Sequence, residues 1–144
     1  MLIAGKWLMC DDGVLRPVLR GEVLAGDGSW ERVEFLVDTG ADCTVFSTAT
    51  LAKLGLQPLD TQDGISGLGG LTNSVIVETQ IQLTRENSGK VLFRGRYAAV
   101  TSLDALDISV LGRDVMGLFA VIVDQPDGVV CMLGQRHCYT IEQD

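Results

Sequence analysis

Short runs of hydrophobic residues, separated by polar turns, extend along most of the chain. In the segment 30–37, Val33, Phe35 and Val37 occupy every second position, with Leu36 between the last two. A period of two is typical of a β-strand, because successive side chains point to opposite faces of a sheet. The pattern predicts that the odd-numbered residues face the core while Leu36 points the other way. Similar runs predict further strands over residues 6–10, 14–19, 21–25, 74–84, 91–100, 108–111, 121–124 and 129–133.

Two short helices interrupt the predicted strands. The segment 47–55 is predicted to be helical, since Ser47 or Thr48 can cap its start and Gly55 suits its end. After Gly112, hydrophobic residues recur at helical spacing and predict a second helix. The segment 64–70 contains four glycines and is predicted to be a loop. Polar turns are predicted to join neighbouring strands at 11–13, 26–29, 86–89 and 126–128.

The composition agrees with a single, mostly antiparallel β domain. The chain has 144 residues, the usual size of one domain, and 47% of them are hydrophobic, which is enough for a packed core. Seventeen glycines and three prolines fit a fold with many tight turns. We therefore expect an all-β fold with two short helices, formed as one domain by residues 1–144.

The charge and the cysteine pattern argue against several classes of protein. The formal net charge is −8 and the few basic residues are scattered, whereas proteins that bind nucleic acids usually present a basic face. We therefore expect neither nucleic acid nor membrane as a partner, and no hydrophobic run reaches the length of a membrane span. The four cysteines form no CxxC pair and there is one histidine, which disfavours a zinc site. Because reduced thiols are typical of the cytoplasm, we expect a cytoplasmic protein without a metal.

One segment carries a candidate catalytic carboxylate. The predicted strand 30–37 leads directly into Asp38, Thr39 and Gly40. A carboxyl at the end of an apolar strand is partly shielded from water, which favours its protonated form and prepares it for proton transfer. Thr39 adds a hydroxyl that can hold a neighbouring backbone, and Gly40 lets another chain approach closely. An Asp-Thr-Gly sequence is also common in ordinary turns, so this motif alone does not establish catalysis.

Two further segments have properties that a peptide-binding site needs. Residues 65–71 place Leu68 among glycines between two strands, so a hairpin tip there would present bare backbone N–H groups to a peptide. The alternative is an ordinary glycine turn; a phosphate loop is disfavoured because neither GxGxxG nor GxxxxGK is present. Residues 108–114 form an apolar strand that ends in a glycine, after which Arg113 starts a helix. Arg113 would either pair with Asp42 or lie on the surface.

Taken together and in this order, the three segments resemble the motifs of retroviral proteases. The resemblance is carried by Asp-Thr-Gly-Ala-Asp at 38–42, the glycine-rich segment 65–71 and Val-Leu-Gly-Arg at 110–113. It covers about residues 33–123. The predicted helix at 47–55 and the tail at 117–133 are more similar to cellular and bacterial retropepsin-like aspartic proteases than to the compact viral enzymes. The resemblance implies a retropepsin-like acid protease fold, with half of a dimeric enzyme in each chain.

The resemblance also implies roles for individual residues. Asp38 would be the catalytic aspartate, Thr39 would brace the two subunits, and Gly40 would lie against the substrate backbone. Ala41 and Arg113 would support the active-site loop, with Arg113 paired to Asp42. The expected substrate contacts, with Leu68 at the tip of a flap, are Leu36, Asp42, Ile65, Ser66, Gly67, Leu68, Ile108 and Val110.

A single Asp-Thr-Gly implies that two copies of the chain are needed. Hydrolysis by this route uses two carboxyls, one that takes a proton from water and one that protonates the carbonyl oxygen. The chain contains the motif once, so a two-fold homodimer would supply the second Asp38. The resemblance thus implies an aspartic endopeptidase that cleaves peptide or protein substrates and needs no cofactor. The hairpin at about 119–141 is expected to be structural or to form part of the dimer.

Two other functions fit the same residues. A non-catalytic peptide-binding or dimerisation module would keep the fold, and only a cleavage assay on unstructured protein would distinguish it from an enzyme. A cysteine hydrolase would use Cys43 as the nucleophile and His137, the single histidine, as its base. Insensitivity to thiol alkylation would dismiss the second of these alternatives.

Overall fold

The structure is a computed structural model that describes residues 1–67, 70–102, 106–134 and 142, with the backbone alone for residues 60–67 and 70–72. The helices are α1 (Thr48–Leu54) and α2 (Arg113–Met116). The strands are β1 (Leu2–Ala4), β2 (Lys6–Met9), β3 (Leu15–Leu24), β4 (Trp30–Val37), β5 (Val45–Phe46), β6 (Asp60–Gly67), β7 (Gly70–Thr84), β8 (Lys90–Val100), β9 (Ser109–Leu111), β10 (Ala120–Asp124) and β11 (Val129–Leu133).

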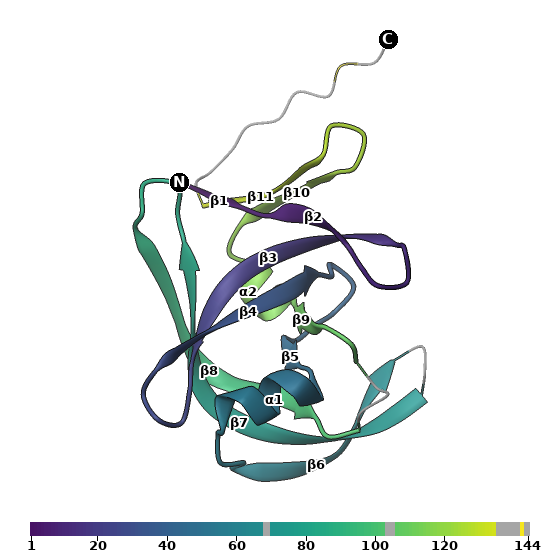
Figure 1. The fold of residues 1–144 in the computed structure, drawn as a ribbon, viewed down its shortest axis with the longest axis vertical. Helices are drawn as coiled ribbons and strands as arrows, with labels where there is room; N and C mark the ends of the chain where they lie inside the picture. The colour runs from purple at the N-terminus through teal and green to yellow at the C-terminus, as the bar shows by residue number, and fades with distance from the viewer. Residues whose placement is uncertain (68–69, 103–105, 135–141, 143–144) are drawn as a thin grey trace.

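The strands form two sheets, as Figure 1 shows. A small antiparallel sheet has the order β1-β11-β10, and the main sheet has the order β2-β3-β4-β9-β5-β8-β7-β6. β3 also pairs with β7, where Gly21 lies opposite Leu83. The strands that lie between them in the sheet, in the order β3-β4-β9-β5-β8-β7, therefore close into a barrel. The mostly antiparallel β architecture with two short helices confirms the fold class expected from the sequence.

One face of β4, the strand that leads to Asp38, packs into the hydrophobic core of the barrel. The three alternating residues of β4 that were predicted to face the core are each at most 7% exposed, and Leu36 on the other face is half-buried. The ring of Phe35 lies 6.1 Å from that of Phe46, which in turn lies 5.8 Å from the ring of Tyr97. Burying one such side chain contributes about 1.5–3 kcal/mol. Burial also raises the pKa of Tyr97 to about 12.

The first helix has the ends expected from its sequence. The Oγ of Ser47 accepts a hydrogen bond from the backbone N–H of Thr50 at 3.2 Å. Gly55 ends the helix with a left-handed φ of 58°, which glycine adopts without steric cost. The carbonyl of Leu54 accepts from Gly26 N–H at 2.8 Å and so fixes the helix to the β3–β4 turn. None of the helices in the described part of the chain has the length and hydrophobicity needed to cross a bilayer.

Several boundaries differ from those expected. Residues 14–19 and 21–25, predicted as two strands, form the single strand β3, because its first half pairs with β2 and its second half pairs with β4 and β7. The prediction of a loop over 64–70 is wrong for residues 64–67 and 70. β6 continues to Gly67 and β7 begins at Gly70, since the two backbones pair along the hairpin. The short strand β1 was not predicted.

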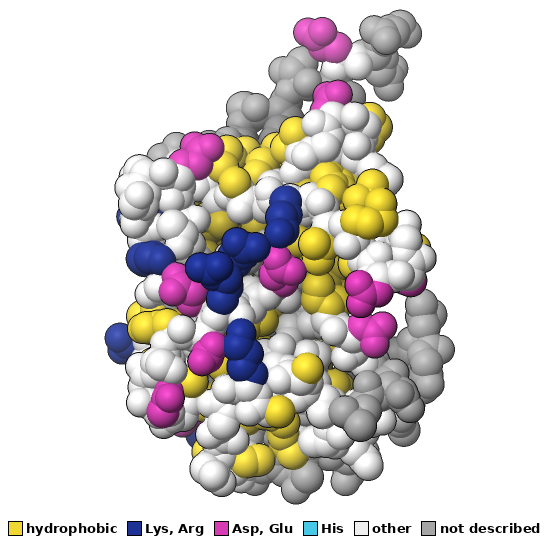
Figure 2. Space-filling view, in the orientation of Figure 1, with side chains coloured by type: hydrophobic (Ala, Val, Ile, Leu, Met, Phe, Trp, Pro, Cys, Tyr) yellow, Lys and Arg dark blue, Asp and Glu magenta, His cyan; other side chains and the backbone are white. Residues whose placement is uncertain are grey.

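Opposite charges pair across the outer face of β3 and β4. Lys and Arg side chains gather there beside acidic side chains, as Figure 2 shows. Glu34 pairs with Lys6 and with Arg20, each at 3.1 Å. Burial alone would raise the pKa of Glu34, but these two cations lower it below its ordinary value. Glu34 is therefore ionised, and its charge is already paired with these two cations.

Candidate active site

Asp38 lies at the end of β4, where the chain leaves the sheet. Its backbone N–H donates to the carbonyl of Leu111 at 3.4 Å, so the motif begins beside the parallel β4–β9 pair. The chain then turns tightly, because Ala41 N–H donates to the Asp38 carbonyl at 3.1 Å and Gly40 N–H donates to Asp38 Oδ1 at 3.0 Å. These bonds fix one carboxylate oxygen within the turn, while Asp38 itself is half-buried.

Arg113 ties the Asp38 turn to the start of α2. Its Nη1 donates to the carbonyl of Thr39 at 2.8 Å, and its Nη2 forms an ion pair with the carboxylate of Asp42. The backbone N–H of Arg113 donates to the carbonyl of Ala41 at 2.9 Å. The pairing of Arg113 with Asp42 that the sequence suggested is thus present. Since both side chains are exposed, the pair orients the turn more than it stabilises the fold.

A second connection, which the sequence did not reveal, joins Thr44 to Asp114. Thr44 is fully buried, and its backbone N–H donates to both carboxylate oxygens of Asp114 at 3.0 Å. The Thr44 hydroxyl donates to Asp114 Oδ1 at 2.7 Å and accepts from Gly112 N–H at 3.1 Å. The sequence offered two hints of this connection, a threonine soon after the Asp-Thr-Gly motif and an aspartate in the first turn of the second helix. Neither hint identifies a contact between residues 70 positions apart.

Gly112 lets these two segments approach each other. A Cβ atom at this position would lie 2.3 Å from the carbonyl carbon of Cys43 and 2.5 Å from its oxygen. Contacts this short involve backbone and cannot be relieved by a side-chain rotation. The sequence indicated Gly112 only as the end of a strand, whereas the structure shows that close backbone packing requires a glycine there.

The residues expected to contact substrate differ in exposure. Leu36 is half-buried on β4, and Ile108, just before the neighbouring strand β9, is half-buried as well. Val110 lies opposite Leu36 in the sheet but is only 6% exposed, so little of its side chain can be reached. Asp42 is exposed beyond the turn.

Three other predicted residues belong to the β6–β7 hairpin. The backbone of Ile65, Ser66 and Gly67 lies in β6, with Gly67 opposite Gly70 of β7. Leu68, the expected flap tip, lies outside the described residues. The flap role of this hairpin therefore stays a prediction.

Two other kinds of site would support a different chemistry, a metal site and the catalytic site of a cysteine hydrolase. Among them, no three His, Cys, Asp or Glu side chains come together in a way that could hold a metal ion. Cys43 is exposed and unbridged, and burial raises the pKa of the Cys131 thiol. His137, the base that a cysteine hydrolase would need, lies outside the described residues.

Two solved structures share this fold. The retropepsin-like aspartic protease from Rickettsia conorii matches with a TM-score of 0.55 and 18% identity, over 92% of this chain and 88% of that one. The EIAV protease complexed with the inhibitor HBY-793 matches with a TM-score of 0.52 and 23% identity, over 71% of this chain and 86% of that one. At these identities the likeness establishes a retropepsin-like fold. A comparison with curated proteins gives no match.

The family is established by sequence. The model of the aspartyl protease family matches residues 22–115 of the 144 in the chain. The matched segment contains β4, the Asp38 turn, the Thr44–Asp114 connection and Arg113. The family match and the shared fold lead to one conclusion: this chain belongs to the aspartyl protease family and has the retropepsin-like fold.

Proposed function

We propose that the chain is an aspartic endopeptidase that works as a homodimer, with one Asp38 from each subunit forming the catalytic pair. The observation that carries the proposal is the Asp38 turn, in which a carboxylate at the end of a buried strand is oriented by Gly40 N–H. Arg113 holds this turn through the Thr39 carbonyl. No described residue donates a hydrogen bond to the second carboxylate oxygen, Oδ2, which leaves that atom for proton transfer.

The chemistry needs two carboxyls in different protonation states. Two carboxyls held close together cannot both ionise comfortably, so they share one proton. The ionised carboxyl takes a proton from water while the water oxygen bonds to the peptide carbonyl carbon, and the other carboxyl protonates the carbonyl oxygen. When the tetrahedral intermediate collapses, the carboxyl that took the proton from water gives it to the amine nitrogen, the other carboxylate takes a proton back from a hydroxyl of the intermediate, and the C–N bond breaks.

The surface around Asp38 supports the requirement for a second subunit. The chain contains Asp-Thr-Gly once, so a single copy offers one carboxyl of this kind. Thr39 and Gly40 are exposed beside Asp38, and a two-fold axis near them would bring the same surface of the partner into contact. In that dimer the Thr39 hydroxyl would bond to the backbone of the partner and hold the two turns together.

The β10–β11 hairpin gives further support for a dimer. The strand register places Ile122 and Val129 on one face of this hairpin, where they are 36% and 40% exposed. Hydrophobic side chains grouped in this way are commonly covered by another chain. We propose that this hairpin contributes to the contact between subunits, as expected for the segment 119–141.

The direct test is cleavage of an unfolded protein by the wild type and by Asp38→Asn. We expect the substitution to lower the rate by about a thousandfold or more, as removal of a catalytic group does. Asp27→Asn, at an exposed position in the turn between β3 and β4, is the matched control and should retain activity. A folded Asp38→Asn protein that cleaves at the wild-type rate would refute the proposal. A folded, dimeric wild type that binds peptides but cuts none would instead favour the non-catalytic module.

A further inference from the structure

A groove of about 880 Å³ opens beside the strand end that carries Asp38. One wall is the β2–β3 hairpin and the other is the segment before β9. The strand register relates this groove to β4 through β3, the strand between β2 and β4. Leu8 of β2 lies opposite Arg16 of β3. Val18, two residues further along β3, lies opposite Leu36 of β4. Because Asp38 is two residues beyond Leu36, the hairpin runs alongside the end of β4.

The groove combines hydrophobic walls with four carboxylates, of which Asp12 and Glu34 are paired with basic side chains. Leu8 and Met9 line one side, and Leu106 and Ile108 line the other. Asp11 and Asp107 stand on opposite walls and are exposed. Neither carboxylate takes part in an ion pair with any residue that the structure describes. In Figure 2, exposed hydrophobic side chains likewise lie between acidic ones on the face in view.

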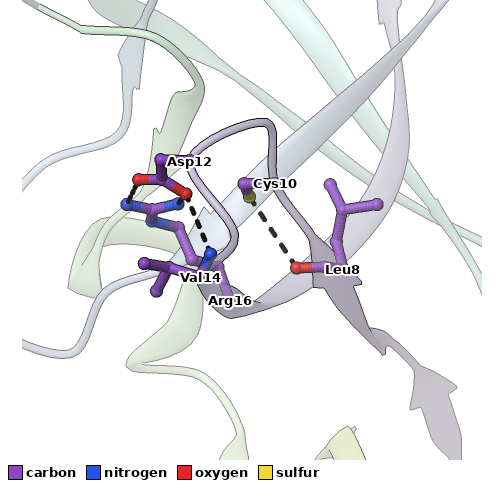
Figure 3. A network of polar contacts seen from close by, with 5 residues as sticks. All are labelled: Leu8, Cys10, Asp12, Val14 and Arg16. Carbon is purple, nitrogen blue, oxygen red and sulfur yellow. Dashed lines mark hydrogen bonds and ion pairs between the residues drawn. The ribbon is translucent and has the colours of Figure 1, made fainter.

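The basic residue of the groove, Arg16, is already occupied. Its guanidinium donates to both carboxylate oxygens of Asp12, at 2.8 Å and 2.6 Å, as Figure 3 shows. The hydrogen bond from Arg16, helped by one from Val14 N–H, lowers the pKa of Asp12 to about 2. Arg16 therefore neutralises Asp12 and leaves the charges of Asp11 and Asp107 uncompensated.

We infer that this groove binds a lysine or arginine side chain of the peptide substrate, with its aliphatic stem on the hydrophobic walls and its charge between Asp11 and Asp107. Lysine and arginine side chains combine an apolar stem with a cationic end, which matches this arrangement. An acidic side chain in the groove would meet two like charges. The inference rests on the proposed endopeptidase function, because it names the substrates that the Asp38 pair would cut.

The position of the groove limits which substrate residue can reach it. Glu34, which lines the groove, precedes Asp38 by four residues on β4, a separation of about 13 Å along a strand. An extended peptide covers that distance with about four residues. The basic side chain is therefore expected within about four residues of the cleaved bond.

The inference is tested with peptides that carry lysine, norleucine or glutamate at each position around the cleaved bond. Norleucine keeps an aliphatic stem but lacks the charge. At pH 6 and low salt, we expect lysine at one position to raise kcat/KM at least about fivefold over norleucine, the size of one partly screened ion pair. The ratio of kcat/KM for lysine over norleucine should approach one when Asp11→Asn and Asp107→Asn are combined, and should remain unchanged in the control Asp27→Asn.

A second measurement separates this inference from the proposed function. Binding of the same peptides to the Asp38→Asn protein, followed by fluorescence anisotropy, should show the same preference for lysine without any cleavage. Equal cleavage and equal binding of lysine and norleucine peptides would overturn the inference even if the protein is a protease. A binding preference that depends on Asp11 and Asp107, in a wild type that cuts nothing, would support the groove and refute the protease.

Discussion

At the scale of single residues, the Asp38 turn depends on two backbones that pass very close to each other. Gly112 lies against Cys43, and this approach allows the Gly112 N–H to reach the Thr44 hydroxyl and the Thr44 N–H to reach Asp114. The Asp38 turn is thus held by the contacts of buried Thr44 and Gly112 and by those of exposed Arg113. Buried contacts should govern stability, and the exposed ones should govern orientation.

Gly112→Ala tests the buried contacts. A methyl group at this site would overlap the Cys43 backbone, so we expect a loss of about 1–3 kcal/mol in the free energy of unfolding. Urea denaturation measures the loss. Gly95→Ala is the matched control, because its Cβ would lie 3.5 Å from the Tyr97 hydroxyl oxygen, and should cost less than about 0.5 kcal/mol. Equal stability losses in the two variants would contradict the role of Gly112.

Arg113→Lys tests the orientation of the turn. An ammonium group cannot reproduce the fork that contacts the Thr39 carbonyl and Asp42 together. We expect kcat/KM to fall by about 10- to 100-fold, since small displacements of a catalytic group cost that much, while stability changes by less than about 1 kcal/mol. Arg96→Lys, at an exposed position on β8, is the control. If both variants cleave like the wild type, Arg113 has no positioning role.

At the scale of elements, the β2–β3 hairpin is fixed by a surface ion pair as well as by its strand pairing. Asp12 and Arg16 face each other across the hairpin, and Arg16 is the main cause of the fall in the pKa of Asp12 from 3.8 to about 2. A carboxyl whose pKa is lower in the folded state stabilises the fold above its unfolded pKa. Its contribution is therefore complete above about pH 4 and disappears as the pH falls towards 2.

Asp12→Asn isolates this contribution. Asparagine can still accept a hydrogen bond from Val14 N–H but has no charge for Arg16. We expect the urea midpoint of the variant to lie below that of the wild type by a constant amount between pH 5 and pH 7, and the difference to vanish by about pH 2. A difference that persists unchanged to pH 2 would show that charge pairing is not its cause.

Local sequence signals were sufficient to predict most elements. The alternation in β4 identified its buried face, and Ser47 and Gly55 identified the ends of α1, because strand faces and helix caps depend on neighbouring residues alone. The same is true of Asp38, whose place at the end of a buried strand follows from the residues before it. The loop predicted at 64–70 was wrong for residues 64–67 and 70, because β6 extends to Gly67, which pairs with Gly70 of β7.

Contacts between distant segments could not be predicted in this way. The buried hydroxyl of Ser109 accepts from Ser47 N–H at 3.0 Å, although the two residues are 62 positions apart. The Thr44–Asp114 connection and the close approach at Gly112 are of the same kind. Thr44 and Ser47 flank β5, which pairs with β9 at Val45 and Val110, and the residue pattern along one strand does not specify its partner.

At the scale of the whole molecule, the barrel is complete but the proposed catalytic site is not. The strands close on themselves through the β3–β7 pairing, whereas Asp38 and its exposed neighbours lie at the surface with no second Asp-Thr-Gly in the chain. The proposed site therefore depends on association of two chains. Each carries a net charge of −8, so repulsion between subunits should fall as the pH is lowered.

Activity is accordingly expected to favour acid to mildly acid pH. One carboxyl of the pair must be protonated and the other ionised, so cleavage should decline on both sides of an acidic optimum. Lower net charge should also strengthen the dimer at the same pH. Initial rates and dimer mass measured over the same pH series check both expectations. A rate that rises steadily towards pH 9 would contradict the shared proton.

The most direct test of the account is the activity of mixed dimers. Wild-type and Asp38→Asn chains, unfolded together and refolded, should pair at random, and only dimers with two intact chains should cleave. At fixed total protein, activity should follow the square of the wild-type fraction, so an equal mixture should keep about a quarter of full activity. Dilution should lower specific activity as dimers dissociate. Activity in simple proportion to the wild-type fraction, unchanged by dilution, would show that each chain acts alone.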